Sequence, residues 1–379
     1  MNGKPKTILI LTADAGLGHR SAAEAIRDAI QLKYQAQAEV VIRNPLDHPD
    51  IPEIVRESQS DYDDIVKAIP ELYKLGYEIS DSNFPVSVME EAFSFLLLDV
   101  MQEIIAGTSP DLIITTYPIY AAPLDDLKHA GRLQIPFISV TTDLVTVHHV
   151  WFNDGVTLLT VPTETVRQLA LEAGLSQEQV IKTGIPVDPQ ILSLKDRDKA
   201  EIRGDLGWQE GPASILVVGS PRIPSLVEIV QALDDSDEDI QFALVAGGNE
   251  ALRKTFEETE WRHPAQVYGF VDIMPELMRA SDLMVSKAGG LIVTESLASG
   301  LPMMLVHVLP GQERGNVGYI VEHKAGRLCE EPETAKETLT AWLKDDRAEL
   351  QRVTENASAL GDADAALNIA EEAWHLLKD

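Results

Sequence analysis

The sequence has little cysteine and few basic residues. Cys329 is the single cysteine among 379 residues, so no disulfide can form within the chain and no zinc site can be built from several cysteines. There are 31 lysines and arginines against 61 aspartates and glutamates, a formal net charge of −30. Nucleic acid and anionic lipid surfaces both attract positively charged proteins. The charge therefore argues against nucleic acid as a partner and against electrostatic docking on anionic lipid.

The sequence also lacks a long hydrophobic run. Its longest nearly uncharged apolar block, residues 92–98, is far below the roughly 20 residues that a membrane-spanning helix needs. The N-terminal apolar run 8–11 is too short for the core of a signal peptide. We therefore expect a cytoplasmic protein that is at most peripheral to a membrane.

The chain does contain a regular alternation of β-branched runs with segments of helical periodicity. The predicted strands are residues 8–11, 40–43, 112–116, 137–141, 158–161, 180–182, 215–218, 242–246, 267–268, 283–285, 303–306 and 327–329. Helical spacing is clearest at residues 21–32, 163–173, 276–280 and 292–299. Continuous apolar strands separated by helices predict parallel sheets that are buried on both faces, and hence an α/β fold.

This alternation restarts near the middle of the chain, which predicts two domains, 1–190 and 191–379. A segment with two prolines at 184–189 and a charged stretch at 195–203 form the expected linker. A helix-rich insertion at 47–105, with helices at 62–79 and 86–105, interrupts the first domain. The last helix is expected at 362–377, where it could pack back on the first domain.

Residues 13–20, Ala-Asp-Ala-Gly-Leu-Gly-His-Arg, directly follow the first predicted strand. Their glycines permit close approach of a ligand to the backbone, and the next helix offers free N–H groups at its start. The segment is neither a dinucleotide fingerprint, because Ser21 stands where a third glycine is required, nor a Walker loop. His19 is either a general base, since imidazole accepts a proton near neutral pH, or a histidine that satisfies the helix end.

Two further polar segments follow predicted strands of the second half. Residues 285–296 read Val-Ser-Lys-Ala-Gly-Gly-Leu-Ile-Val-Thr-Glu-Ser, in which a glycine pair opens a helix beside Lys287, a combination that suits an anion. Glu295 either accepts hydrogen bonds from hydroxyl groups or complements the helix dipole. Residues 310–316, Pro-Gly-Gln-Glu-Arg-Gly-Asn, carry the donors and acceptors that sugar hydroxyls require, although alone they also fit a turn with a helix cap.

Together these segments resemble glycosyltransferase family 28, in particular its branch of monogalactosyldiacylglycerol synthases and processive diacylglycerol glucosyltransferases. The resemblance covers nearly the whole chain. Besides the three segments above, the motifs that carry it, in the family's order, are Pro110-Asp111-Leu112-Ile113-Ile114, Tyr117-Pro118, Thr142-Asp143-Leu144, His148, Trp151-Phe152, Gly184-Ile185-Pro186-Val187 and Gly269-Phe270-Val271. It implies a GT-B fold, in which two Rossmann-like domains face each other across a cleft with their parallel sheets.

The resemblance also implies an activity. It is the inverting transfer of galactose or glucose from a uridine-diphosphate (UDP) sugar to diacylglycerol, in glycolipid synthesis at the inner face of a membrane. The acceptor would bind to the first domain and the UDP-hexose donor to the second. No metal and no cofactor are expected for the chemistry, and the oligomeric state stays open.

Individual roles follow from the resemblance residue by residue. His19 would be the general base, and Asp143 would orient it, contact the acceptor, or simply cap the end of a strand. The implied acceptor-binding residues are Gly16, Tyr117, Pro118, His148 and Trp151. The implied donor-binding residues are Gly18, Ser220, Arg222, Phe270, Val271, Lys287, Gly289, Gly290, Leu291, Glu295, Gln312, Glu313 and Asn316.

The sequence departs from the family at two loops, at Ala15 and Leu17 in the first loop and, more plainly, after the first strand of the second domain. Where the family has a glycine-rich turn, this chain reads Ser220-Pro221-Arg222. Proline cannot donate an N–H, so the Ser220 hydroxyl and the Arg222 guanidinium would have to replace backbone donors. The departure keeps a non-catalytic UDP-sugar-binding protein open as an alternative.

Other enzymes and sites also stay open. One is a UDP-N-acetylglucosamine transferase that acts on a polyprenyl-linked peptidoglycan precursor, and another is a nucleotide-sugar epimerase. His148 and His149 have no nearby cluster of carboxylates and histidines at ligand spacing, so no metal site is predicted there. The apolar run 93–98 either touches a bilayer or belongs to a buried helix.

Overall fold

The computed structural model describes residues 4–14, 17–53, 56, 86–220, 222–308 and 312–378, with side chains except at 17, 86–96 and 312. The chain divides into two compact units. Unit 1 comprises Met1–Asp143, Val147–Pro186 and Ala365–Asp379, and unit 2 comprises Leu144–Thr146 and Val187–Asp364. Much of the insertion expected at 47–105, including its helix at 62–79, lies outside the described residues, and so do the side chains of most of the apolar run 93–98.

Unit 1 contains a six-stranded sheet in which every strand is parallel to its neighbours, in the order β2-β1-β3-β4-β5-β6. Its strands are β1 (Lys6–Leu11), β2 (Ala38–Arg43), β3 (Leu112–Thr115), β4 (Phe137–Val140), β5 (Leu158–Val161) and β6 (Val180–Lys182). Its helices are α1 (Leu17–Tyr34), α4 (Val86–Thr108), α5 (Ala121–His129), α6 (Glu164–Glu172) and α15 (Ala365–Leu376). Short 3-10 helices are η1 (Gln35–Gln37), η2 (Pro45–Asp47), η3 (Pro118–Tyr120), η4 (His149–Trp151) and η5 (Gln177–Gln179).

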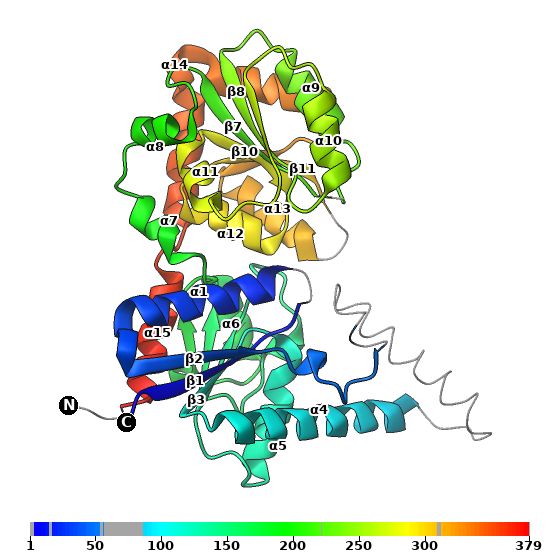
Figure 1. Ribbon diagram of the computed structural model, residues 1–379, viewed down its shortest axis with the longest axis vertical. Coiled ribbons are helices and arrows are strands. Elements are labelled where there is room, and N and C mark those ends of the chain that lie inside the picture. Colours follow the sequence, from blue (N-terminus) through cyan, green and yellow to red (C-terminus); the bar gives the residue numbers. More distant parts are fainter. Residues whose placement is uncertain are drawn as a thin grey trace. The chain divides into compact units, whose positions relative to one another are not determined.

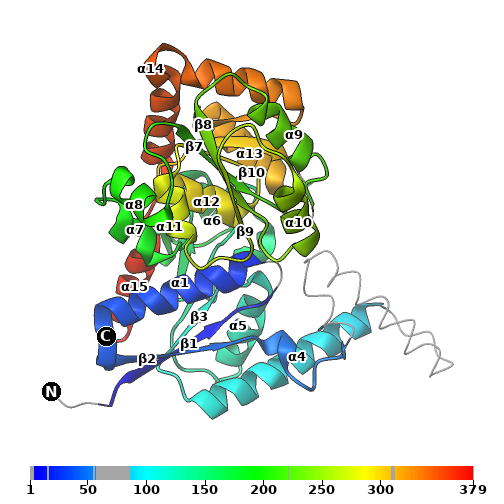
Figure 2. The same cartoon turned by 45° about the horizontal axis from the view of Figure 1, so that its top comes forward.

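The alternation of side chains along β1 explains the layers of unit 1. Successive residues of a strand point to opposite faces of the sheet. Ile8 and Ile10 lie in the core that α1 and α15 cover, whereas Leu9 and Leu11 lie in the core that α4, α5 and α6 cover. The C-terminal helix α15 packs alongside α1, and both views show the pair on one face of the sheet (Figures 1 and 2).

Unit 2 repeats the plan with the strand order β12-β11-β10-β7-β8-β9, again entirely parallel. Its strands are β7 (Ala213–Val218), β8 (Ile240–Val245), β9 (Ala265–Tyr268), β10 (Leu283–Lys287), β11 (Met303–His307) and β12 (Gly326–Leu328). Its helices are α7 (Pro189–Leu194), α8 (Lys199–Leu206), α9 (Leu226–Asp234), α10 (Glu250–Glu258), α11 (Met274–Ala280), α12 (Gly290–Ala298), α13 (Gln312–Glu322) and α14 (Pro332–Leu360).

The core of unit 2 lies on both faces of its sheet. Apolar residues of β7 and β8 pack against α9, α10 and α14, while α11 and α12 lie on the opposite face (Figure 2). The α14 segment departs from helical dihedral angles at Lys344–Arg347, so it is two helices joined at a kink. The predicted α/β class with parallel sheets is confirmed in both units.

The strand orders also place the ligand-binding edge of each sheet. In an open parallel sheet, ligands bind at the carboxyl ends of the strands where the strand order reverses. In unit 1 this point lies between β1 and β3, and in unit 2 it lies between β7 and β10. Within the described residues, no helix has the length and apolarity needed to cross a membrane.

Candidate active site

In unit 1, polar side chains gather at the carboxyl ends of β1, β3 and β4, which are neighbours in the sheet. His19 lies in the first turn of α1, directly after the loop that follows β1. Thr116 follows β3, and Thr142 follows β4 by two residues. The topology therefore brings three segments that are distant in the sequence to the point where the strand order reverses.

The two threonines contact the Nδ1 edge of the His19 imidazole. The Nδ1 atom of His19 lies 2.8 Å from the backbone oxygen of Thr116 and 2.9 Å from Oγ1 of Thr142. A carbonyl oxygen only accepts hydrogen bonds, so we assign the proton of the neutral ring to Nδ1. The lone pair then lies on Nε2, and no described residue makes a hydrogen bond to that atom.

A hydrogen bond also holds the backbone of His19. The Thr116 hydroxyl donates to the backbone oxygen of His19 at 3.0 Å and lies 2.9 Å from the hydroxyl of Thr12. Thr12 and Thr116 are fully buried. The first turn of α1 is thus fixed to the ends of β1 and β3, which orients the ring from both its backbone and its side chain.

Aromatic rings enclose His19. Tyr117 meets it edge-on with ring centroids 4.9 Å apart, and the Trp151 ring lies 6.3 Å away. Both aromatic residues are fully buried. Burial lowers the pKa of His19 to about 4, against a smaller opposing effect of the Thr116 carbonyl. The imidazole is therefore neutral at physiological pH, as a general base must be.

Asp143 supports Trp151 rather than the Nδ1 atom of His19. Its Oδ2 accepts a hydrogen bond from the Trp151 indole at 2.7 Å. Burial raises the pKa of Asp143 to about 6, while the indole hydrogen bond acts in the opposite direction. Asp143 thus holds the aromatic ring that lies beside the histidine, a contact that the sequence did not suggest.

The remaining unit 1 candidates surround this group. Pro118 is buried and begins η3. His148 is exposed and caps η4, its Nδ1 accepting from the backbone N of Val150 at 3.2 Å. Gly18 lies beside His19 in α1, and Gly16 lies outside the described residues.

Sequence reasoning missed Thr12, Thr116 and the hydroxyl of Thr142 as parts of this group. Thr142 stands in the Thr-Asp-Leu motif, which was a signal that the position mattered. Its contact with His19 joins residues 123 positions apart, so only the strand order reveals it.

In unit 2 the predicted donor residues also follow neighbouring strands. Ser220 and Arg222 follow β7, and Gly289 follows β10, on the two sides of the point where the strand order reverses. The backbone N of Arg222 donates to Oγ of Ser220 at 3.3 Å, and the Arg222 residue is exposed. Pro221 itself lies outside the described residues.

The start of α12 combines several positive groups. Gly289 is the N-cap of α12, so the helix begins at Gly290 and Leu291 with unpaired backbone N–H groups. A Cβ atom at Gly289 would lie 2.6 Å from Nζ of Lys287, which places the ammonium at the helix start. Cations are unfavourable at this end of a helix dipole, whereas anions are favourable. The arrangement is suited to a bound anion.

Residues of α13 support this helix start. Glu313 is buried, and its Oε1 lies 2.5 Å from Nζ of Lys287. Asn316, also buried, donates from Nδ2 to the backbone oxygen of Ala288 at 2.9 Å, which fixes the turn before Gly289. Gln312 begins α13, and its side chain lies outside the described part of the chain.

Glu295 is a carboxyl held in an unfavourable environment. Burial raises its pKa to about 8, and the negative charge of Asp188 acts in the same direction. Among the described residues no hydrogen bond reaches the Glu295 carboxyl. The Glu295 side chain is only partly buried, so its carboxyl is available to accept hydrogen bonds from a ligand.

An exposed aromatic ring stands at the far side of the same sheet edge. Phe270 is 75% exposed and follows β9, with Val271 next to it. β9 lies three strands from β10, about 14 Å at a spacing of about 4.8 Å per strand. An extended ligand could therefore have its anionic part at α12 and a flat ring at Phe270.

Within the described part of the chain, neither group contains a cluster of metal ligands. Among the described residues, a group of histidine and carboxylate side chains able to hold a metal ion occurs at His48, Asp50 and Glu103, and it shares no residue with the two groups above.

Comparison with known families gives two matches. Residues 19–187 match the model of monogalactosyldiacylglycerol (MGDG) synthase, and residues 214–372 match the glycosyltransferase family 28 C-terminal domain. The chain is 34% identical over 389 residues to a probable chloroplastic monogalactosyldiacylglycerol synthase of Glycine max, covering 99% of this chain and 72% of that protein. It is 31% identical over 387 residues to chloroplastic monogalactosyldiacylglycerol synthase 3 of Arabidopsis thaliana, covering 98% and 81%.

Solved structures of other proteins share the fold of this chain. Acinetobacter baumannii MurG has a TM-score of 0.66 at 16% identity, over 98% of this chain and 100% of that one. A UDP-GlcNAc 2-epimerase from Neisseria meningitidis has a TM-score of 0.61 at 16% identity, over 99% and 100%. The GT-B class expected from the sequence is confirmed, and at this level of identity the likeness concerns the fold alone.

Proposed function

Because this chain belongs to the monogalactosyldiacylglycerol synthase family, we propose that it transfers galactose from UDP-galactose to the free hydroxyl of diacylglycerol. The structural observation that supports the proposal best is His19. Its ring is neutral and presents the Nε2 lone pair, as a base that activates a hydroxyl requires.

We propose the following chemistry. The acceptor hydroxyl gives its proton to Nε2 of His19 while its oxygen attacks the anomeric carbon of galactose. The bond from that carbon to the diphosphate breaks, and UDP leaves with the electron pair. A single displacement of this kind inverts the anomeric centre. Thr116 and Thr142 occupy the Nδ1 side of the ring, so the ring accepts the proton at Nε2.

The donor is assigned to unit 2 on the chemistry of its residues. The diphosphate suits the start of α12 with Lys287, because N–H groups and an ammonium stabilise the charge that develops on the leaving group. Glu295 is proposed to accept the ribose hydroxyls, and Phe270 with Val271 to contact the uracil. Gln312, Glu313 and Asn316 are proposed to face the sugar, and Ser220 and Arg222 to contact the phosphates.

No metal is proposed for the transfer step itself. The positive groups at α12 are of the kind that can take over the stabilisation of a leaving diphosphate.

We further propose that the enzyme works on the surface of the membrane that carries its lipid acceptor, on the cytoplasmic side. The single cysteine is consistent with a reducing compartment. With a net charge of −30, contact with the membrane is expected to be apolar or to rest on a local basic surface. If the contact is apolar, binding to vesicles should change little with salt, whereas a steep loss of binding with rising salt would indicate a local basic surface instead.

The proposal is tested with purified protein, diacylglycerol vesicles and three donors: UDP-galactose, UDP-glucose and UDP-N-acetylglucosamine. Mass spectrometry of the lipid product should show one added hexose, formed fastest from UDP-galactose. Faster transfer from UDP-glucose would show that the transferred sugar is glucose rather than galactose. Conversion of the donor without lipid would indicate an epimerase, and donor binding without any turnover would indicate a binding protein.

A further inference from the structure

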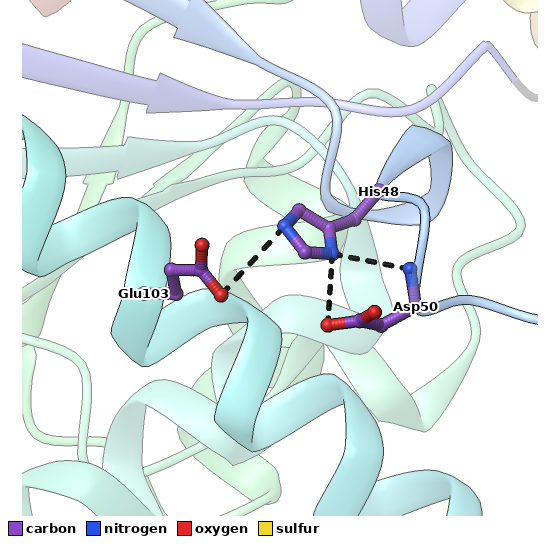
Figure 3. Close-up of side chains that lie close together, drawn as sticks. All are labelled: His48, Asp50 and Glu103. Carbon is purple, nitrogen blue, oxygen red and sulfur yellow. Dashed lines mark hydrogen bonds and ion pairs between the residues drawn. The ribbon is translucent and has the colours of Figure 1, made fainter.

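Three side chains that the proposed transfer does not use meet at one end of unit 1. His48 follows η2 directly, Asp50 stands two residues later, and Glu103 projects from α4 (Figure 3). One ligand atom from each of the three lies within 4.8 Å of the others. In Figure 3 the imidazole points toward both carboxylates, which come from separate segments of the chain.

The scaffold on both sides of this cluster is fixed. Leu46 and Ile51 are buried on either side of His48 in the sequence, and the His48 side chain is only 20% exposed. On α4, Val100 and Met101 are buried in the core of unit 1, within one turn of Glu103. The three groups therefore sit on anchored backbone, while the two carboxylates themselves remain open to solvent.

Two other carboxylates of unit 1 are each paired with a basic side chain. Asp14 is paired with Arg20 at 2.8 Å, and Asp111 with Lys6 at 3.0 Å. No lysine or arginine within the described part of the chain pairs with Asp50 or Glu103. The backbone N of Asp50 donates to Nδ1 of His48 at 3.4 Å. The two carboxylates face different nitrogens of this ring, with Nδ1 3.6 Å from Oδ2 of Asp50 and Nε2 3.9 Å from Oε2 of Glu103.

These separations are too long for hydrogen bonds but suit ligands of a shared ion. Hydrogen bonds between nitrogen and oxygen are about 2.7–3.2 Å long. In a tetrahedral zinc site with bonds of about 2.1 Å, the ligand atoms lie roughly 3.4 Å apart. Because the two carboxylates face different ring nitrogens, sharing one ion would require the exposed carboxylates to move by up to about 1.4 Å, from the 4.8 Å within which the three ligand atoms lie to that spacing.

We propose that His48, Asp50 and Glu103 bind one divalent zinc ion, with water completing the coordination. An imidazole with two carboxylates is a ligand set of the kind zinc uses, whereas Ca²⁺ and Mg²⁺ prefer oxygen ligands alone. The ion joins the segment after η2 to α4. The same segment is tied to the β1–α1 loop through Asn44, whose Nδ2 donates to Asp14 at 3.2 Å. The zinc site is independent of the proposed transferase activity.

The test uses the untagged full-length protein, stripped of metal with a chelator and titrated with ZnCl₂ by calorimetry. One saturable zinc ion per chain is expected, together with a zinc-dependent rise in melting temperature, because a ligand that binds the folded state stabilises it. Glu103→Gln and His48→Gln should each weaken zinc binding at least about tenfold, since even the loss of an outer-shell partner costs about 10–100-fold. MgCl₂ and CaCl₂ should compete poorly.

A matched control is His375→Gln. His375 has a single carboxylate, Glu372, also 3.9 Å away, and no third ligand in the described group of candidates. This variant should bind zinc like the parent protein. The proposal is overturned if the parent shows no saturable zinc binding, or if Glu103→Gln and His48→Gln bind zinc as tightly as His375→Gln does. Circular dichroism of the metal-free variants checks that each is folded.

Discussion

The Nδ1 atom of His19 lies 2.8 Å from the backbone oxygen of Thr116, so a main-chain carbonyl orients the proposed base. A carbonyl cannot take a proton or lose its hydrogen-bonding role as the pH changes. It holds Nδ1 in the protonated form and leaves Nε2 free to accept a proton. The residues that can tune this base are therefore those that touch the ring by their side chains, namely Thr142, Tyr117 and Trp151.

The hydroxyl of Thr142 is expected to position His19. Thr142→Val removes the hydroxyl oxygen that accepts a hydrogen bond from Nδ1, and a neutral hydrogen bond is worth about 0.5–1.5 kcal/mol. We expect kcat/KM for galactose transfer to fall by roughly two- to tenfold, with UDP affinity unchanged. Thr142→Ser, which keeps the hydroxyl, should restore activity. Equal activity of the valine and serine variants would show that the contact plays no part in the reaction.

The burial of His19 determines the pH at which transfer activity falls on the acid side of its pH profile. Burial lowers the pKa of His19 to about 4 in the folded protein, so the base becomes protonated only as the pH approaches that value. The kcat/KM for transfer should stay nearly flat from pH 7 to pH 6, below the pH near 8 at which Glu295 titrates, and fall toward pH 4. Asp143→Asn serves as the control, because the carboxyl it removes titrates near pH 6. An acid limb at pH 6.5, the value of an ordinary histidine, in both proteins would contradict the enclosed ring.

The ionised Asp143 carboxylate is expected to lower the free energy of unfolding at neutral pH. Its folded pKa of about 6 lies above the unfolded value of 3.8, so the folded state binds more protons between these values and loses stability as the pH rises through them. Asp143→Asn keeps an acceptor for the Trp151 indole without the charge. The variant should be more stable at pH 7 by about 1–3 kcal/mol and no more stable at pH 3.5.

Urea unfolding at the two pH values measures this difference. His19 contributes in the opposite sense, since its folded pKa lies below the unfolded value and its contribution is lost as the pH falls from 6.5 to 4. Stability of the Asp143→Asn variant should consequently rise more steeply with pH in this range than that of the parent. Parallel curves for the two proteins would rule out a raised pKa for Asp143.

Glu295 should show opposite effects on stability and on binding. Its folded pKa of about 8 lies above the unfolded value of 4.5, so its contribution to stability is lost as the pH rises toward 8. Glu295→Gln should raise stability at pH 8 by about 2–4 kcal/mol. If the carboxyl accepts the ribose hydroxyls, the same variant should weaken UDP binding roughly ten- to a hundredfold. Calorimetry with UDP and thermal unfolding measure the two effects.

The control for that experiment is Glu322→Gln, an exposed position at the end of α13. It should change neither UDP affinity nor stability. A Glu295→Gln variant that binds UDP like the parent would remove Glu295 from the proposed donor site.

Much of the fold was predictable because the strands are short apolar runs between turn signals. Each of the twelve predicted strands corresponds to a strand of the described residues, from β1 to β12, with ends shifted by at most two residues. The long α14 escaped prediction because charged residues interrupt its apolar spacing. Its buried Leu339, Trp342, Leu350 and Val353 mark the apolar side only once the sheet is known.

The sequence predicted those parts of the candidate sites that lie within a single segment of the chain. The motifs around His19 and Gly289 are local and stand at the ends of strands. The contacts of His19 with Thr116 and Thr142 depend on strand order, which no local pattern specifies. The same holds for Glu103, which is separated from His48 by 55 residues and meets it through the packing of α4 on η2.

The most direct test of the central claim is galactose transfer from UDP-galactose to diacylglycerol by the parent protein and by His19→Ala. We predict that the parent forms the monogalactosyl lipid. The variant should lose about 10²–10⁴-fold in rate, the usual contribution of a general base, while binding UDP with unchanged affinity. Full transfer by His19→Ala, or no galactolipid from the parent protein, would contradict the account.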